Sequence, residues 1–368
     1  MGAGALDLQR VRRLRLAHQQ LAAPSLADPA AVVSHMLAMQ AQEYPMARWA
    51  IALRTKGSVT DDVVEAACDE GRILRLHALR PTWHFVAAED IRLVLQVTAP
   101  RVHQANAFMY RSLDLDRPRL DRFADHVAGL LAGGNHLTRK EIRDRLPSGW
   151  VEEKGFHMAY LLMYAELEGV IVSGPRHGKQ PTYALLDERA APTPELSDDE
   201  ALVQFVRRYL QTRSPATIPD LTTWSGLTVA QVKRALAVLG DEVTTVEEGG
   251  RAYLLVEDEA APESGARSFL MPDYDEYGMA YKDRSALAFP GRDYWTLPWN
   301  RAVVVDGVIA GAWQRTLGRE VVTVEVEMFE LAGADPRVVA AAEEYAAFLG
   351  RELDLKLVES AAPSKRRV

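Results

Sequence analysis

The sequence predicts an α+β protein in which one supersecondary unit occurs three times, followed by a β-rich C-terminal part. Apolar residues recur at helical spacing in several consecutive segments, and each group of such segments is followed by two segments typical of a β-hairpin. In the last third of the 368 residues most apolar segments are short or alternating. Helices followed by a hairpin are the order of a winged helix, so we expect three tandem winged-helix modules.

The first module is expected within residues 1–100. Its helices are predicted from Leu8 to Leu21, from the N-cap Asp28 to Gln40, across Trp49 to Arg54, and from Thr60 to Gly71. The segments 73–80 and 82–86, separated by Pro81, alternate or run apolar and predict the hairpin of this module.

The second module is expected within residues 101–190. Three helices are predicted to follow the first hairpin, one beginning at Glu89, before this boundary, and two beginning at Arg101 and Arg119. A short basic helix follows over 137–146, where Thr138 and Glu141 form a capping box, and another helix spans 156–167. The hairpin is predicted over 169–185, with Arg176, His177 and Lys179 at its tip.

The third module is expected within residues 195–260, after a proline-rich linker. A capping box at Ser197 and Glu200 begins the helix predicted over 198–213. Two more helices are predicted over 217–224 and 228–239, and a hairpin turns at Gly249-Gly250. The region 261–368 is predicted to be β-rich. Its strands are expected over 267–271, 302–305, 308–313 and 321–329, before a helix that ends at Leu349.

Composition narrows the possible classes of protein. Hydrophobic residues make up 48% and charged residues 26%, which excludes general disorder. No apolar run is long enough to cross a membrane, and the Arg-rich N-terminus has no signal-peptide pattern, so we expect a cytoplasmic protein with no membrane contact. The single cysteine, Cys68, rules out an internal disulfide framework and is expected to be a small buried side chain.

Charge is unevenly distributed along the chain. The net charge is −8, yet residues 1–150 hold 20 Lys and Arg against 16 Asp and Glu, whereas the remainder holds 23 against 35. Local basic patches decide phosphate binding more than the overall balance does. The candidate phosphate contacts are Arg75, Arg80, Arg139, Lys140, Arg143, Arg176 and Lys179. Basic residues of this kind are also typical of ordinary solvated surfaces. The repeated winged-helix order is the observation that favours nucleic acid as the partner.

Four motifs occur in order along the chain. They are Leu37-Ala-Met-Gln-Ala-Gln42, Arg80-Pro-Thr-Trp-His-Phe85, Met271-Pro-Asp-Tyr-Asp-Glu-Tyr277 with Tyr281-Lys-Asp-Arg284, and Val303–Trp313. Together they resemble the AlkZ family of bacterial winged-helix DNA glycosylases, relatives of the YcaQ (AlkX) proteins. The resemblance extends from about residue 8 to about residue 350.

The resemblance implies a fold, an activity and a site. It implies three winged helices around a concave DNA-binding channel, and excision of N7-alkylguanine with unhooking of interstrand cross-links, without a metal or other cofactor. The catalytic pair would be Gln40 and Gln42, and the Gln-x-Gln form points to the branch associated with self-resistance to azinomycin-like alkylating natural products. The partner would be duplex DNA carrying alkyl adducts or cross-links, and we expect a monomer.

Several alternatives remain at this stage. A non-catalytic winged-helix regulator fits the modules equally well, although the chain is long for one and no dimerising heptad helix is evident. Asp273, Asp275 and Glu276 form an acidic cluster, for which structural carboxylates are the commoner outcome than a metal site. His84 lies on a predicted strand near the channel and is expected to be a further DNA contact.

Overall fold

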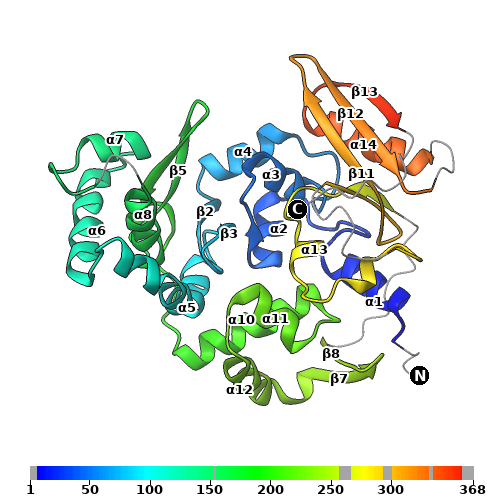
Figure 1. Ribbon diagram of the computed structural model, residues 1–368, viewed down its shortest axis with the longest axis horizontal. Helices are drawn as coiled ribbons and strands as arrows, with labels where there is room; N and C mark the ends of the chain where they lie inside the picture. Colours follow the sequence, from blue (N-terminus) through cyan, green and yellow to red (C-terminus); the bar gives the residue numbers. More distant parts are fainter. Residues whose placement is uncertain (1–5, 152–154, 257–266, 293–300, 331–334, 359–368) are drawn as a thin grey trace.

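The computed structural model describes residues 6–151, 155–256, 267–292, 301–330 and 335–358. After a first helix, α1 (Leu8–His18), three units of the same connectivity follow one another. In Figure 1 the first unit lies at the centre, the second to the left and the third below, while the C-terminal sheet lies at the upper right. The mixed α+β class predicted from the sequence is confirmed.

The first unit shows the winged-helix order in full. It contains α2 (Pro29–Met36), β1 (Met39–Gln40), α3 (Tyr44–Ala52), α4 (Asp61–Asp69), β2 (Ile73–His77) and β3 (Trp83–Ala87). The short β1 pairs with β3, so the sheet has the order β1-β3-β2. This short strand between the first two helices was not predicted, and it carries Gln40.

The second unit repeats that connectivity. It contains α6 (Arg117–Leu131), β4 (Leu137–Thr138), α7 (Arg139–Asp144), α8 (His157–Leu167), β5 (Ile171–His177) and β6 (Gln180–Leu185). Its sheet order, β4-β6-β5, is the same as that of the first unit. The predicted capping box at Thr138 and Glu141 is present at the start of α7.

A single long helix, α5 (Ile91–Ser112), joins the first two units. The sequence predicted two helices here, beginning at Glu89 and Arg101, and the structure corrects this. Pro100 lies inside α5 without ending it, because one face of the helix is buried from Ile91 to Val102 and packing outweighs the local cost of the proline. The predicted boundary between modules at residue 100 therefore falls within a helix.

The third unit has the same order once more. It contains α10 (Asp198–Arg213), α11 (Ile218–Ser225), α12 (Val229–Leu239), β7 (Val243–Glu248) and β8 (Arg251–Val256), and α9 (Leu186–Arg189) precedes it. A single bridge between Ala216 and Leu254 stands where the other units have a short strand. The capping box at Ser197 and Glu200 is present, as predicted.

The C-terminal part is a five-stranded sheet in the order β13-β12-β11-β10-β9. The elements are β9 (Ser268–Leu270), α13 (Glu276–Met279), β10 (Ala302–Val305), β11 (Val308–Leu317), β12 (Val321–Met328), α14 (Pro336–Phe348) and β13 (Glu352–Val358). The last strand, which lies parallel to β12, was missed, although the alternation of Leu353, Leu355 and Leu357 indicates it.

The hairpin β2–β3 lies between two hydrophobic cores. Residues on one face, including Ile73 and Phe85, belong to a core shared by α1–α4 and the C-terminal sheet. Residues on the other face, including Leu74 and Val86, belong to a core shared with α5 and the third unit. The second unit has a core of its own.

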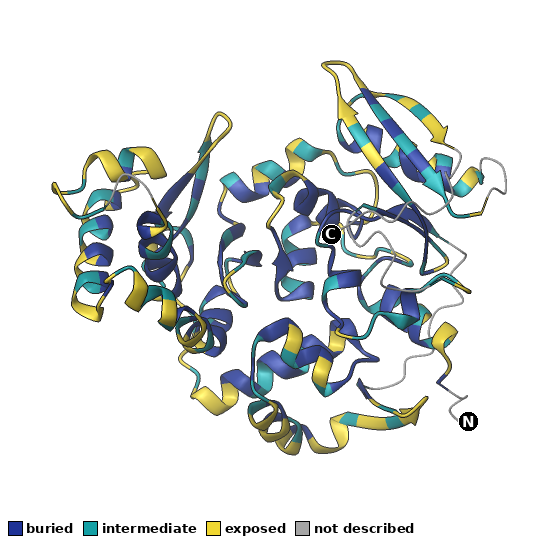
Figure 2. Ribbon diagram, in the orientation of Figure 1, coloured by how far each residue is buried: buried dark blue, intermediate teal, exposed yellow. Residues whose placement is uncertain are grey.

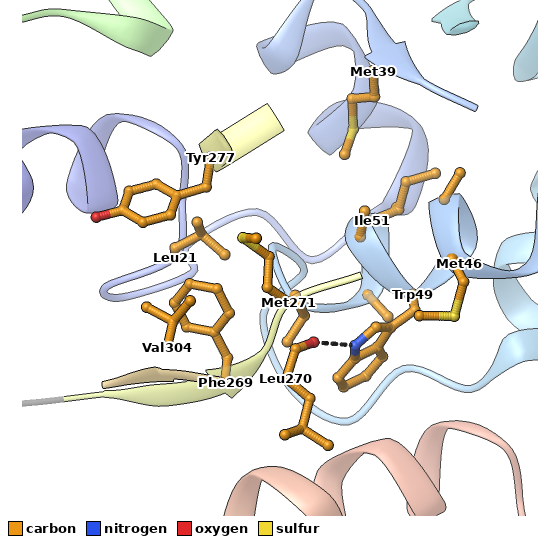
Figure 3. Close-up of a cluster of buried hydrophobic side chains, with 14 of the residues drawn as sticks. Leu21, Met39, Met46, Trp49, Ile51, Phe269, Leu270, Met271, Tyr277 and Val304 are labelled. Atoms are coloured by element: carbon orange, nitrogen blue, oxygen red, sulfur yellow. Dashed lines mark hydrogen bonds between the residues drawn. The ribbon is translucent and has the colours of Figure 1, made fainter. Parts of the chain in front are cut away.

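Figure 3 shows how the first unit meets the C-terminal sheet. The indole of Trp49, on α3, donates to the carbonyl of Leu270 on β9 at 2.8 Å. Met39, Ile51, Phe269 and Met271 belong to the same hydrophobic core. The residue that precedes Gln40 is therefore anchored in a core that spans most of the chain.

Candidate active site

The segment that carries the two glutamines begins with an unusual turn at Leu37. Leu37 has φ 62° and ψ −50°, and the N–H of Ala38 donates to the carbonyl of Met36 at 2.7 Å. This is the geometry of a γ-turn, which is rare and strained. The turn ends α2 at Met36, so the prediction that this helix continues to Gln40 was wrong.

Arg213, from the end of α10, holds this turn in place. Its guanidinium donates to the carbonyls of Met36 and Ala38, each at 2.9 Å. The side chain of Arg213 is completely buried and forms an ion pair with Glu276 at 2.7 Å. A strained turn persists only when its surroundings fix it, and here a residue 175 positions away along the chain does so.

Glu276 connects this ion pair to the backbone of Gln40. One carboxylate oxygen accepts from Arg213 and from the indole N–H of Trp224 at 2.8 Å. The other accepts from the backbone N–H of Gln40 at 2.9 Å. Glu276 is itself 1% exposed. The third unit and the C-terminal part together therefore fix where Gln40 lies.

The side chains of Gln40 and Gln42 both lie against the start of β3. Gln40 is paired with His84, is 6% exposed, and accepts a long hydrogen bond of 3.4 Å from Arg80. Gln42 is exposed, and its amide oxygen accepts from the backbone N–H of Trp83 at 3.5 Å. Within the described residues neither side-chain NH2 group donates to a partner, so both remain available to water or a ligand.

The residue between the two glutamines is clamped on both sides. The N–H of Ala41 donates to the carbonyl of Trp83 at 2.7 Å. The carbonyl of Ala41 accepts two hydrogen bonds from the guanidinium of Arg75, at 3.0 and 2.9 Å. Because the backbone groups around the motif are held in this way, the two amides are presented by a rigid segment rather than by a mobile loop.

The predicted DNA contacts fall into two groups. Much of α7 and the tip of the β5–β6 hairpin are exposed (Figure 2). Arg139, Lys140 and Arg143 are exposed on α7, and Lys179 is exposed at the hairpin tip. Lys140 forms an exposed ion pair with Asp144 at 2.5 Å, which competes weakly with a phosphate. The other group, half-buried beside the glutamines, is Arg75 and Arg80, while Arg176 is half-buried near the base of its hairpin tip.

His84 does not occupy the position predicted for it. It lies on β3 as expected, opposite Gln40 on β1, but its side chain is completely buried because it faces the core shared with the third unit. Burial lowers the pKa of His84 to about 3, with Arg80 contributing further. A neutral, buried imidazole cannot contact a phosphate from this position, so the prediction of a DNA contact at His84 was wrong.

This burial predicts a pH dependence of stability. The pKa of His84 is lower in the folded chain than its ordinary value of 6.5, so the unfolded chain takes up the proton first. His84 therefore contributes stability that is present above pH 6.5 and is lost as the pH falls toward 3, by up to about 1.4 kcal/mol per pH unit.

Urea unfolding between pH 4 and pH 8 tests this prediction. His84→Gln is expected to flatten the dependence of the unfolding free energy on pH. His177 is exposed, so His177→Gln is the control and should leave that dependence unchanged. An unchanged pH profile in His84→Gln would contradict the assignment.

The carboxylates of the acidic cluster form ion pairs with arginines. Asp273 pairs with Arg301 at 2.8 Å, and Asp275 pairs with the fully buried Arg54 at 2.7 Å, as Glu276 does with Arg213. Within the described residues no group of three or more His, Cys, Asp and Glu side chains is placed to hold a metal ion. Cys68 is buried, and burial raises its thiol pKa to about 12.

Four residues that shape the site were not predicted from the sequence: Arg213, Trp224, Tyr44 and Trp83. One signal was available for Arg213. It follows Tyr209 by one helical turn on the apolar face of a predicted helix, and a cation on such a face requires a buried anion. The acidic cluster at 273–276 was the obvious supply of anions. The aromatic residues give no such signal, because their spacing equally fits an ordinary core.

Comparison with known proteins adds an independent result. A family model described as "DNA glycosylase AlkZ-like" matches residues 33–348. Among solved structures, the fold is similar to that of the Streptomyces sahachiroi DNA glycosylase AlkZ, with a TM-score of 0.76 at 22% sequence identity, over 96% of this chain and 100% of that one. No curated protein matches the sequence. No helix among the described residues is long and apolar enough to cross a membrane.

Proposed function

This chain belongs to the AlkZ-like DNA glycosylase family, and we propose that it hydrolyses the N-glycosidic bond of N7-alkylguanine with Gln40 and Gln42. Family membership makes the protein a DNA N-glycosylase. The lesion and the catalytic pair are the proposal. The observation that carries it is the pair of amides with unoccupied NH2 groups on a segment whose backbone is held by Arg75, Arg213 and Glu276.

The chemistry of the lesion explains why amides suffice. Alkylation at N7 gives guanine a positive charge, so the base accepts the electrons of the breaking C1′–N9 bond and leaves neutral. The oxygen of a water molecule forms the new bond to C1′, and its proton passes to solvent. Glycosidases that expel a poorer leaving group need two carboxylates. Here the NH2 groups of the two amides can donate to the oxygen of the water and orient it. Each amide oxygen keeps a second lone pair beside its one long hydrogen bond, and its dipole can stabilise the developing positive charge on the sugar.

The wider substrate range belongs to the same proposal. We propose that the protein also unhooks interstrand cross-links made through N7 of guanine, and that it protects a producer of an azinomycin-like alkylating agent. A cross-linked base cannot be drawn into a closed pocket, and the exposure of Gln42 supports access from an open surface. Release of free N7-methylguanine from methylated duplex DNA is the first test. A duplex with one N7-linked cross-link tests the unhooking.

The regulator alternative loses support from the helices that would read a sequence. In a winged helix the last helix before the hairpin usually enters the major groove. In the first unit this is α4, which carries Asp61, Asp62, Glu65 and Asp69. In the second it is α8, of which all residues except Ala159 and Tyr160 are buried. Neither of these two helices is suited to contact bases, which disfavours sequence-specific binding through the first two units.

Binding to duplex DNA should therefore be electrostatic and indifferent to sequence. Replacing Arg143 or Lys179 by Glu is expected to weaken binding to all duplexes alike, because each replaces one exposed cation by an anion. The slope of log K against log salt should fall by roughly 0.9 for each phosphate that the variant no longer neutralises. Fluorescence anisotropy at several salt concentrations measures both. Affinity independent of salt, or preference for one undamaged sequence, would refute the expectation.

Excision should continue in excess EDTA. The proposed reaction uses amides and water and requires no Lewis acid to activate the water. Single-turnover excision with and without EDTA measures this. Complete loss of activity, restored by one divalent metal, would overturn the proposed mechanism.

A further inference from the structure

A cavity of about 330 Å³ lies between the hairpins of the first and second units. Its walls come from the start of α3, from the end of α4, from β2 and β3, and from β5 and β6. The backbone N–H of Arg75 donates to the hydroxyl of Ser173 at 2.8 Å and joins β2 to β5 across its floor. The volume is at the lower end of the range of small-molecule sites, about 300–1,000 Å³, and is far larger than a methyl group needs.

The cavity adjoins the proposed catalytic pair. Trp83 lines it, and its backbone N–H is the group that contacts the amide oxygen of Gln42. Arg75 also lines it, and its guanidinium is the group that clamps the carbonyl of Ala41. A group attached to a lesion held at the glutamines therefore has a neighbouring space into which it can project.

The walls are suited to a flat ring. Tyr44 and Trp83 both line the cavity, and the guanidinium of Arg75 lies over both rings, 4.1 Å from the centre of Trp83 and 5.7 Å from that of Tyr44. The ring of Phe85 meets Tyr44 edge-on at 5.5 Å. The imidazole of His77 also lies 3.9 Å from the ring of Trp83, so a ligand meets Trp83 at its edge. Aromatic rings also pack edge-to-face, as Phe85 does with Tyr44, and this geometry suits a flat apolar group.

The charge of the walls selects against a cation. Arg75 has no carboxylate within ion-pair distance among the described residues, and burial lowers the pKa of its guanidinium. Arg176 lies on the same cavity, 4.7 Å from the ring of Tyr44, and is 3.6 Å from Glu65. Asp69 also lines the cavity and Glu65 pairs with Arg176, so Arg75 is the lining cation left without a carboxylate partner among the described residues. Its charge disfavours a second cation beside it, so the cationic alkylated base is not the ligand that fits here.

We propose that this cavity is a subsite for a neutral or anionic planar aromatic group carried by a bulky N7 lesion. The inference rests on the proposed function, since it assumes that the lesion is cleaved at Gln40 and Gln42. It adds a second point of recognition, by which the protein binds a lesion through its substituent as well as through the alkylated base.

Filling the cavity from its rim tests the subsite. Pro181 is exposed and lines the cavity, and neither it nor its neighbour Gln180 belongs to the proposed catalytic or DNA-binding residues. In single-turnover excision from duplexes containing N7-methylguanine or N7-benzylguanine, Pro181→Trp is expected to raise the half-saturating enzyme concentration for the benzyl lesion at least tenfold. The methyl lesion should change less than twofold. Gln180→Trp, which adds the same side chain one residue away from the cavity, should change neither.

A second variant and a third substrate make the result decisive. Pro45→Trp fills the same cavity from the α3 side and should act like Pro181→Trp if the latter fails a thermal-melting check. A benzyl group bearing a trimethylammonium substituent should bind the wild-type protein more weakly than plain benzyl. The subsite would be overturned if the filling variants changed excision of the methyl and benzyl lesions equally, or changed neither. The proposed function would remain intact in both cases. If the wild-type protein does not release N7-methylguanine, the proposed function fails and the subsite fails with it.

Discussion

Gln40→Ala and Gln42→Ala are each expected to lower single-turnover excision of N7-methylguanine by at least tenfold, about 1.4 kcal/mol of transition-state stabilisation per decade. Each substitution removes one amide that would orient the attacking water, while the backbone clamps at Ala41 and Glu276 remain. The affinity for duplex DNA should be retained, because neither side chain is charged.

The two variants should differ in stability. Gln40 is buried and accepts from Arg80, so Gln40→Ala should lower the melting temperature slightly, whereas Gln42 is exposed and its replacement should not. Gln9→Ala, on the exposed side of α1, is the matched control and should leave rate and stability unchanged. Wild-type rates in both folded catalytic variants would remove the assignment.

Glu276→Gln is expected to destabilise the fold by about 3–5 kcal/mol, because it leaves the buried guanidinium of Arg213 without a counter-ion. Excision should fall as well, even under conditions where the variant is folded, because the hydrogen bond to the backbone N–H of Gln40 is weakened. Urea unfolding followed by tryptophan fluorescence gives the first quantity, and single-turnover excision gives the second.

Two further variants separate charge from position. Glu343→Gln, at an exposed position on α14, should be nearly neutral. Adding Arg213→Met to Glu276→Gln removes the uncompensated charge and should restore part of the stability, but not the rate, because the γ-turn at Leu37 is then no longer clamped. If Glu276→Gln alone were as stable and active as the wild type, Glu276 would have no role in positioning Gln40.

The elements that the sequence predicted well are those determined by neighbouring residues. The capping boxes at Thr138 and Ser197 depend on a residue three positions away, so they can be recognised without the fold. α5 was predicted as two helices because Pro100 is a local signal against a helix, and only the packing of its buried face outweighs that signal. β13 carries a local signal in its alternating leucines, but its place beside β12 in a parallel pair could not be derived from adjacent residues.

The candidate site was predicted only in part, for the same reason. Gln40 and Gln42 came from the resemblance, and their surroundings could not have been derived from adjacent residues. Two residues in a continued helix two positions apart would diverge. The structure places Gln40 on β1 and Gln42 just beyond its end, with both side chains against the start of β3, because Arg213 fixes the turn at Leu37 from the third unit.

The buried ion pairs have a consequence for the ancestry of such chains. Arg54 belongs to the first unit and Arg213 to the third, yet both depend on carboxylates at 275 and 276, and Arg15 lies 3.9 Å from Asp220 of the third unit. A fragment that ended before residue 268 would bury Arg54 and Arg213 without counter-ions. Recombination that exchanged one unit between relatives would bring an unmatched arginine into the core unless the acidic segment changed with it. Three units that share one connectivity are therefore expected to be inherited together, as a single linked block.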